Sequence, residues 1–216
     1  MSESATSYYQ IMQIIEQFDE TLKLSVLQAI EDAKDISTTS IYDNGGNFKG
    51  ELQQGDILLD MPVIEFQNTT DKQVVVKNGP CVVISNTCDL SIKKRGPRIT
   101  YAPIVRASNY LKLLKKSGED ERNFDAWVNN YLKKQHVNKL IWLEPSDKVP
   151  YEGIIVLDHL LSASINHLLP TRELIGSKWG GSMNMAGWLF MVGKLTGFYY
   201  RPTDDQLLFR LGLNNS

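Results

Sequence analysis

The stretch "GPCVVISNTCDLSI", Gly79 to Ile92, decides how the fold is read, because β-forming residues give way abruptly to polar ones within it. Its first part is apolar without alternation: Cys81, Val82, Val83 and Ile84. A strand with one wet face would alternate, so we predict a strand over 81–85 that is buried on both faces. The chain must then reach the surface at Asn86, where backbone polar groups need partners.

Short runs rich in valine and isoleucine extend on both sides of this stretch. They predict strands at 55–60, 63–67, 73–78, 81–86, 99–105, 139–145 and 153–160, with a further strand entering a turn within 162–170. Turn residues separate the early runs at Met61-Pro62, Asn68–Asp71, Asn78-Gly79-Pro80 and Arg95-Gly96-Pro97. So many short strands in quick succession are typical of a small barrel or sandwich.

Helical patterns lie before, between and after these strands. Residues 7–35 carry one apolar stripe: Ile11, Ile14, Ile15, Phe18, Leu22, Val26, Leu27 and Ile30. We divide the chain into an N-terminal helix and linker at 1–50 and a β-rich domain at 51–216. A helical insertion is predicted at about 107–136, and an apolar helix over 184–202 closes the chain. This helix is expected to pack on the sheet or in a homodimer.

Composition restricts the classes of function. The net charge of −2 argues against the whole molecule attracting nucleic acid, although Lys93 to Arg98 places four cations in six residues. No stretch has the roughly 20 apolar residues of a membrane span, and no secretory signal is seen. The two cysteines cannot form a zinc framework and indicate reduced thiols. We expect a cytoplasmic protein without membrane contact, metal or cofactor.

Four segments in order resemble the motifs of the MazF/PemK toxin family. They are "QQGDILLDMPV", "NGPCVVISN", "ITYAPIV" and "YEGIIVLDHLLSASINHLLP", within about 55–105 and 151–170. The resemblance implies an α+β fold: an SH3-like β-barrel of MazF/PemK type, here with an N-terminal helix, a helical insertion and a C-terminal helix.

The same resemblance implies a function and also departs from it. Family members of known activity are endoribonucleases that need no metal, and an arginine before the proline of "RPxVVIS" stabilises the phosphorane. That position is Gly79 here, and the family's hydroxyl residue after "API" aligns with Val105. We therefore expect a non-catalytic or degenerate binding module of a prokaryotic toxin–antitoxin or defence system, with an antitoxin-like protein as partner. The alternative is a metal-independent endoribonuclease acting on single-stranded RNA, with Arg98 or Arg106 replacing the lost arginine.

The polar cluster after the strand supplies the candidate site. We predict a binding site for a ligand or peptide formed by Ser85, Asn86, Thr87, Asp89, Lys93, Lys94 and Arg95. A catalytic interpretation pairs Cys88 as nucleophile with His159 as base, but the adjacent carboxylate of Asp89 would disfavour a thiolate. The structural alternative is a strand end in which Cys88 is a small buried residue and Asp89 caps the turn.

Overall fold

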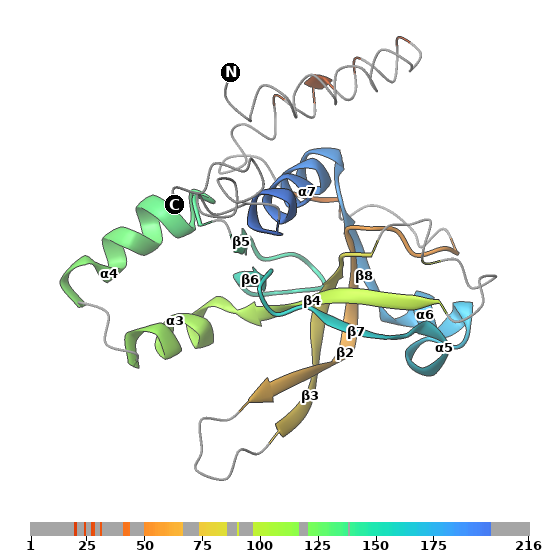
Figure 1. Ribbon diagram of the computed structural model, residues 1–216. Coiled ribbons are helices and arrows are strands. Elements are labelled where there is room, and N and C mark those ends of the chain that lie inside the picture. Colours follow the sequence, from red (N-terminus) through yellow and green to blue (C-terminus); the bar gives the residue numbers. More distant parts are fainter. Residues whose placement is uncertain are drawn as a thin grey trace, which may run out of the picture.

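The computed structural model describes residues 41–43, 50–66, 74–85, 90, 97–116, 121–137 and 139–199, together with five helical positions between 20 and 31. These residues form an α+β fold around an antiparallel sheet (Figure 1). Across this described part of the chain, no helix is long and apolar enough to cross a membrane.

The sheet has eight strands, seven of which follow one path. In spatial order they are β1 (Tyr42–Asp43), β8 (Trp179–Met183), β2 (Asp56–Phe66), β3 (Val74–Val83), β4 (Arg98–Arg106), β6 (Gly153–Val156) and β5 (Leu140–Leu143). The eighth strand, β7 (Leu161–Ser164), pairs with the first half of β4, and β6 pairs with its second half. Since β3 borders β4 on its other edge, β6 and β7 follow one another along a single edge of β4.

Helices lie between and after the strands. They are α3 (Ala107–Lys116), α4 (Glu121–Trp127), the π-helix η2 (Val128–Leu132), α5 (Ile165–Leu168), α6 (Arg172–Lys178) and α7 (Met185–Tyr199). The first three fall between β4 and β5, which confirms a helical insertion within 107–136. The strand predicted within 162–170 was extended too far, because the chain turns helical at Ile165, whose amide donates to Pro97 O.

Two predicted turns are wrong. Met61-Pro62 lies inside β2 and Asn78-Gly79-Pro80 lies inside β3, so each predicted pair of strands is one long strand. The register shifts between Leu58 and Met61, where two β2 residues face Pro80 alone, and Asp60 has a φ of 56°. A bulge of this kind leaves the ladder unpaired at Pro80, so a residue without an N–H is accepted within the strand.

The core confirms that the strand at 81–85 begins with residues buried on both faces of the sheet. Val82 belongs to a cluster with Ile57, Ala102 and residues of α7, whereas its neighbours Cys81 and Val83 belong to a second cluster with residues of α5 and α6. Figure 1 shows α7 and the α5–α6 pair covering different sides of the sheet. The predicted apolar C-terminal helix therefore packs intramolecularly, through Ala186 and Met191.

A third cluster lies under the helical insertion. The face of β5 and β6 that meets the insertion contributes Leu140, Trp142, Ile154 and Val156. The insertion contributes Ala107 and Leu132. Partly buried Tyr110, Leu111 and Trp127 pack against them. The insertion thus covers an apolar surface that would otherwise be exposed.

The N-terminal helix is described at Glu20, Leu24, Leu27, Gln28 and Glu31, which are helical and exposed. At about 100° per residue they lie on the side of the helix opposite the centre of the predicted stripe. Leu27, at the margin of the stripe, is 36% exposed. The other stripe residues lie outside the described residues.

Two glycines of α7 give a test of its packing. A Cβ at Gly187 would lie 2.6 Å from Ile41 O and 2.8 Å from Ile41 Cβ, whereas a Cβ at Gly193 would meet nothing within 4 Å. We predict that Gly187→Ala lowers the free energy of unfolding by about 1–3 kcal/mol through overpacking against backbone. Gly193→Ala should raise it by about 0.5–1 kcal/mol, because alanine favours the helix. Urea denaturation checks both, and equal effects would contradict the described packing of α7.

Candidate functional site

The strand exit at Ser85 is fixed by hydrogen bonds from several elements. The amides of Ile84 and Ser85 both donate to Thr100 O, at 2.8 and 3.1 Å, and Ser85 Oγ accepts from Thr100 N at 2.6 Å. Gln54 Nε2 donates to Ile84 O at 2.8 Å, and Gln54 Oε1 accepts from Trp188 Nε1 of α7 at 3.1 Å. The hydroxyl of Ser85 therefore holds the end of β3 to β4.

The rest of the predicted binding site lies outside the described residues. This applies to Asn86, Thr87, Cys88, Asp89, Lys93, Lys94 and Arg95. The chain is described again at Leu90, which is 4% exposed and packs in the second cluster. The polar segment 86–89 is thus bounded on both sides by fixed positions, while the pairing of Cys88 with His159 stays a prediction.

The two candidate arginines lie at opposite ends of β4. They are the first and last residues of this nine-residue strand, which sets their Cα atoms roughly 26 Å apart at about 3.3 Å per residue. Arg98 Nε donates to Ser162 Oγ and its Nη2 to Ser162 O, both at 3.3 Å. The Arg106 guanidinium lies 4.4 Å from the centroid of the Tyr151 ring. The structure does not bring the two guanidinium groups to one site.

Neither His159 nor the Cys81 thiol is placed for catalysis. His159 lies in the turn between β6 and β7, where its amide donates to Val156 O at 3.2 Å. Cys81 is fully buried, and this burial raises the pKa of its thiol well above the ordinary range. A thiol held neutral in this way is inert as a nucleophile.

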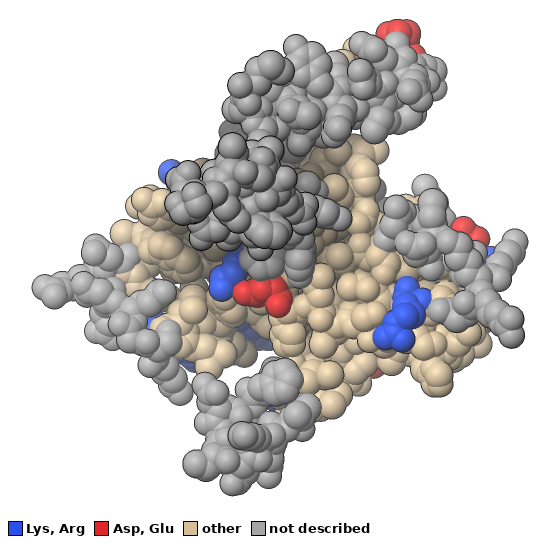
Figure 2. Space-filling model, viewed as in Figure 1, with Lys and Arg blue, Asp and Glu red and all other residues tan. Residues whose placement is uncertain are grey.

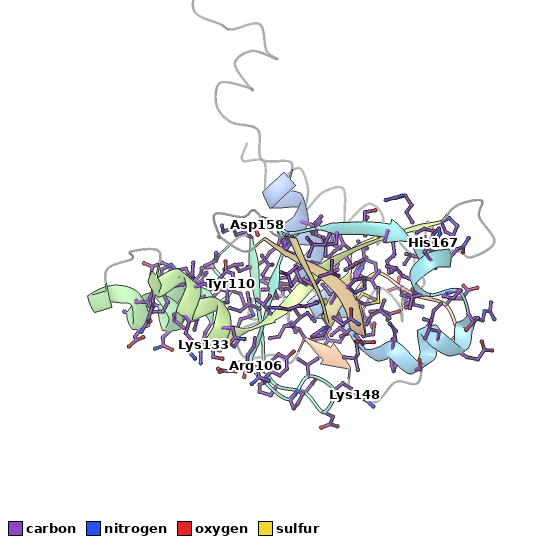
Figure 3. All side chains as sticks on the ribbon, turned by 90° about the horizontal axis from the view of Figure 1, so that it is seen from below. Arg106, Tyr110, Lys133, Lys148, Asp158 and His167 are labelled. Carbon is purple, nitrogen blue, oxygen red and sulfur yellow. The ribbon has the colours of Figure 1, made fainter. Side chains whose placement is uncertain are left out.

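A cationic and aromatic group at the end of β4 was missed by the sequence reasoning, apart from Arg106. Lys133 Nζ lies 3.0 Å from Glu152 Oε1 and 4.8 Å from the centroid of the Trp142 ring. The register pairs Arg106 with Gly153, next to Glu152, so both cations lie at the same end of the sheet. Figure 3 shows Arg106 and Lys133 there, far from His167. The Arg106 guanidinium is exposed, whereas Lys133 is half-buried and paired with Glu152; both kinds of cation bind phosphate.

Charge elsewhere is dispersed. On the face shown in Figure 2, the described lysine, arginine, aspartate and glutamate side chains form small separate groups. Within the described ranges, no three histidine, cysteine, aspartate or glutamate side chains lie together as a possible metal site.

Asp56 is a buried carboxylate that joins two strands. It is 4% exposed, and its Oδ2 accepts from Gln53 N at 2.7 Å, with further hydrogen bonds from the side chains of Ser182 and Trp179 on β8. Burial raises the pKa of Asp56, and the three hydrogen bonds oppose that rise. Its environment indicates a structural role at the start of β2.

Lys194 is a partly buried cation on α7. Its Nζ donates to Val137 O at 2.6 Å and to Leu140 O at 2.7 Å, and it lies 5.0 Å from the centroid of the Phe190 ring. Burial lowers the pKa of Lys194 to about 8. Its hydrogen bonds join α7 to the start of β5.

Replacing Asp56 tests its structural role. Asp56→Ala removes the acceptor for three donors, and each buried donor left unpaired costs about 1–3 kcal/mol. We therefore predict a loss of about 2 kcal/mol or more in the free energy of unfolding, measured in urea. Asp158→Ala is the control: Asp158 forms a surface ion pair with Lys139 at 3.1 Å, and its loss should cost about 1 kcal/mol or less. A smaller effect at Asp56 than at Asp158 would contradict this role.

The lowered pKa of Lys194 predicts a pH dependence. Between about pH 8 and pH 10.5 the unfolded chain keeps a proton that folded Lys194 has released, so Lys194 makes the free energy of unfolding rise with pH. Buried Cys81 and Tyr101 have raised pKa values, so they make the free energy of unfolding fall as pH rises. The test therefore compares wild type with Lys194→Met. The free energy of unfolding of wild type minus that of the variant should increase as pH rises through this window. A difference that stays constant with pH would disprove the assignment.

No family model matches the chain, and no curated protein sequence matches it at a significant level.

Proposed function

We propose that this chain is a MazF/PemK-like binding module, without catalytic activity, of a prokaryotic toxin–antitoxin or defence system. The four motif segments support this proposal because they correspond to β2, β3, β4 and the strands β6 and β7, which both pair with β4, so that all are contiguous in the sheet. The SH3-like barrel is the closed form that we propose for this sheet.

The lack of an arginine at the family's position carries the non-catalytic part of the proposal, because Gly79 of β3 stands there. A fixed guanidinium at the reacting phosphate is what phosphorane stabilisation needs. Arg98 and Arg106 lie at opposite ends of β4, and Gly79 has no side chain. Packing does not demand this glycine, since a Cβ there would meet Val63 Cγ2 at an ordinary 3.8 Å.

We propose the segment after Ser85 as the partner-binding region. The bonds between Ser85 and Thr100 give it a fixed base, and Lys93, Lys94 and Arg95 follow in the sequence. Cations in a short segment favour an acidic partner surface. An antitoxin-like protein with an acidic segment fits this chemistry.

A specific observation favours the endoribonuclease alternative. Arg106 is exposed, stacks on Tyr151 and lies at the same end of the sheet as Lys133. Cations beside aromatic rings are used by proteins that bind single-stranded RNA. In this alternative, Arg106 would contact the phosphate.

An RNA cleavage assay in the presence of a metal chelator separates the two functions. We predict that wild type, Arg98→Ala and Arg106→Ala leave single-stranded RNA intact, while wild type co-purifies with the co-expressed product of the adjacent gene. Gly79→Arg restores the family's side chain, and the RNA cleavage that this variant gains measures how much of the rest of the site is retained. Cleavage by wild type that Arg106→Ala abolishes, with melting temperature unchanged, would establish the endoribonuclease instead.

A further inference from the structure

Among the strands that the structure describes, β5 ends the sheet, yet its outer edge is closed. Lys139 O accepts from Leu157 N on the β6 side. Because main-chain groups alternate along a strand, those of Leu140 and Trp142 point outward, away from β6. Each of their four outward main-chain groups has a partner. Leu140 N donates to Val137 O at 3.2 Å, Leu140 O accepts from Lys194, and both groups of Trp142 bond to Gln135.

The side chain of Gln135 takes the place of a neighbouring strand. Its Oε1 accepts from Trp142 N at 2.9 Å and its Nε2 donates to Trp142 O at 2.7 Å. A paired residue of an antiparallel strand would exchange the same two bonds. Gln135 is buried, so these bonds are shielded from water.

The backbone at Gln135 would be better served by glycine. Gln135 has a φ of 63°, its amide donates to Leu132 O, and the amide of His136 donates to Tyr131 O. These two bonds form a Schellman motif, in which the left-handed position is usually glycine. A glutamine at this position strains the backbone, and its side-chain bonds to Trp142 offset that strain.

Lys194 closes the other half of the edge from a different element. It reaches Leu140 O from α7, and burial disfavours its charge. Two side chains distant in sequence therefore bond three of the four outward main-chain groups of Leu140 and Trp142.

We propose that Gln135 and Lys194 form an edge cap that prevents β5 from pairing with β5 of a second copy of this chain. The edge is self-complementary: a two-fold axis at Ile141 would set Leu140 opposite Trp142 of the second copy, and these residues would exchange both main-chain bonds. An uncapped strand edge is a template for such pairing. A second copy presents the same edge in the same geometry.

Gln135→Gly is the sharpest test because it eases the backbone while removing half of the cap. Amide hydrogen exchange should show Trp142 exchanging at least tenfold faster than in wild type. Sedimentation velocity of Gln135→Gly combined with Lys194→Met should show a species larger than wild type that increases with concentration. Lys139→Met, which removes an exposed cation beside the same strand, is the control and should sediment like wild type.

Two results would overturn the proposal. Unchanged protection of Trp142 in Gln135→Gly would show that this side chain does not cap the edge. If the Trp142 amide exchanges faster but the variant sediments like wild type at every concentration, the bonds of Gln135 to Trp142 stabilise the fold without a role in association. Circular dichroism confirms that each variant is folded, and if the double variant unfolds, sedimentation of Gln135→Gly alone decides.

Discussion

The arrangement of this protein depends on the burial of the end of β3 and the middle of β4 on both faces. Val82 faces one side of the sheet while Cys81 and Val83 face the other, and all three are excluded from water. A strand of this kind needs an apolar cover on each side. The cover comes from α7 on one face and from α5 and α6 on the other, so the helices near the C-terminus are part of the core.

Buried or partly buried polar side chains recur at strand ends and edges, because the backbone there has no neighbouring strand to bond. Asp56 holds the turn before β2 to β8, Ser85 holds the end of β3 to β4, and Gln135 closes the edge of β5. Each meets main-chain donors or acceptors that burial would otherwise leave unpaired. These ends are also where the chain leaves the core, so they decide which segments are free to meet a partner.

The same geometry shapes the proposed function. A β4 strand that carries one arginine at each end cannot focus both on one phosphate, and each guanidinium already has a neighbour in Ser162 or Tyr151. A surface with separate cationic positions suits recognition of a partner better than stabilisation of one reacting group. The closed edge of β5 directs such recognition away from strand addition at that end of the sheet.

Local pattern in the sequence determined the β-rich centre, the insertion within 107–136, the apolar C-terminal helix and the two-sided burial at 81–83, the first part of the strand predicted over 81–85. Each depends on periodicity over a few neighbouring residues. The predicted turns at Met61-Pro62 and Asn78-Gly79-Pro80 are wrong, and the bulge that accommodates Pro80 depends on the pairing of β2 with β3, which no local pattern shows. Of the candidate site, the sequence named Ser85, Arg98 and Arg106, but it could not tell that the two arginines stand apart. Tertiary structure alone decided the contacts of Lys133, Gln135 and Lys194, because they join elements whose approach is set by packing and by no local signal.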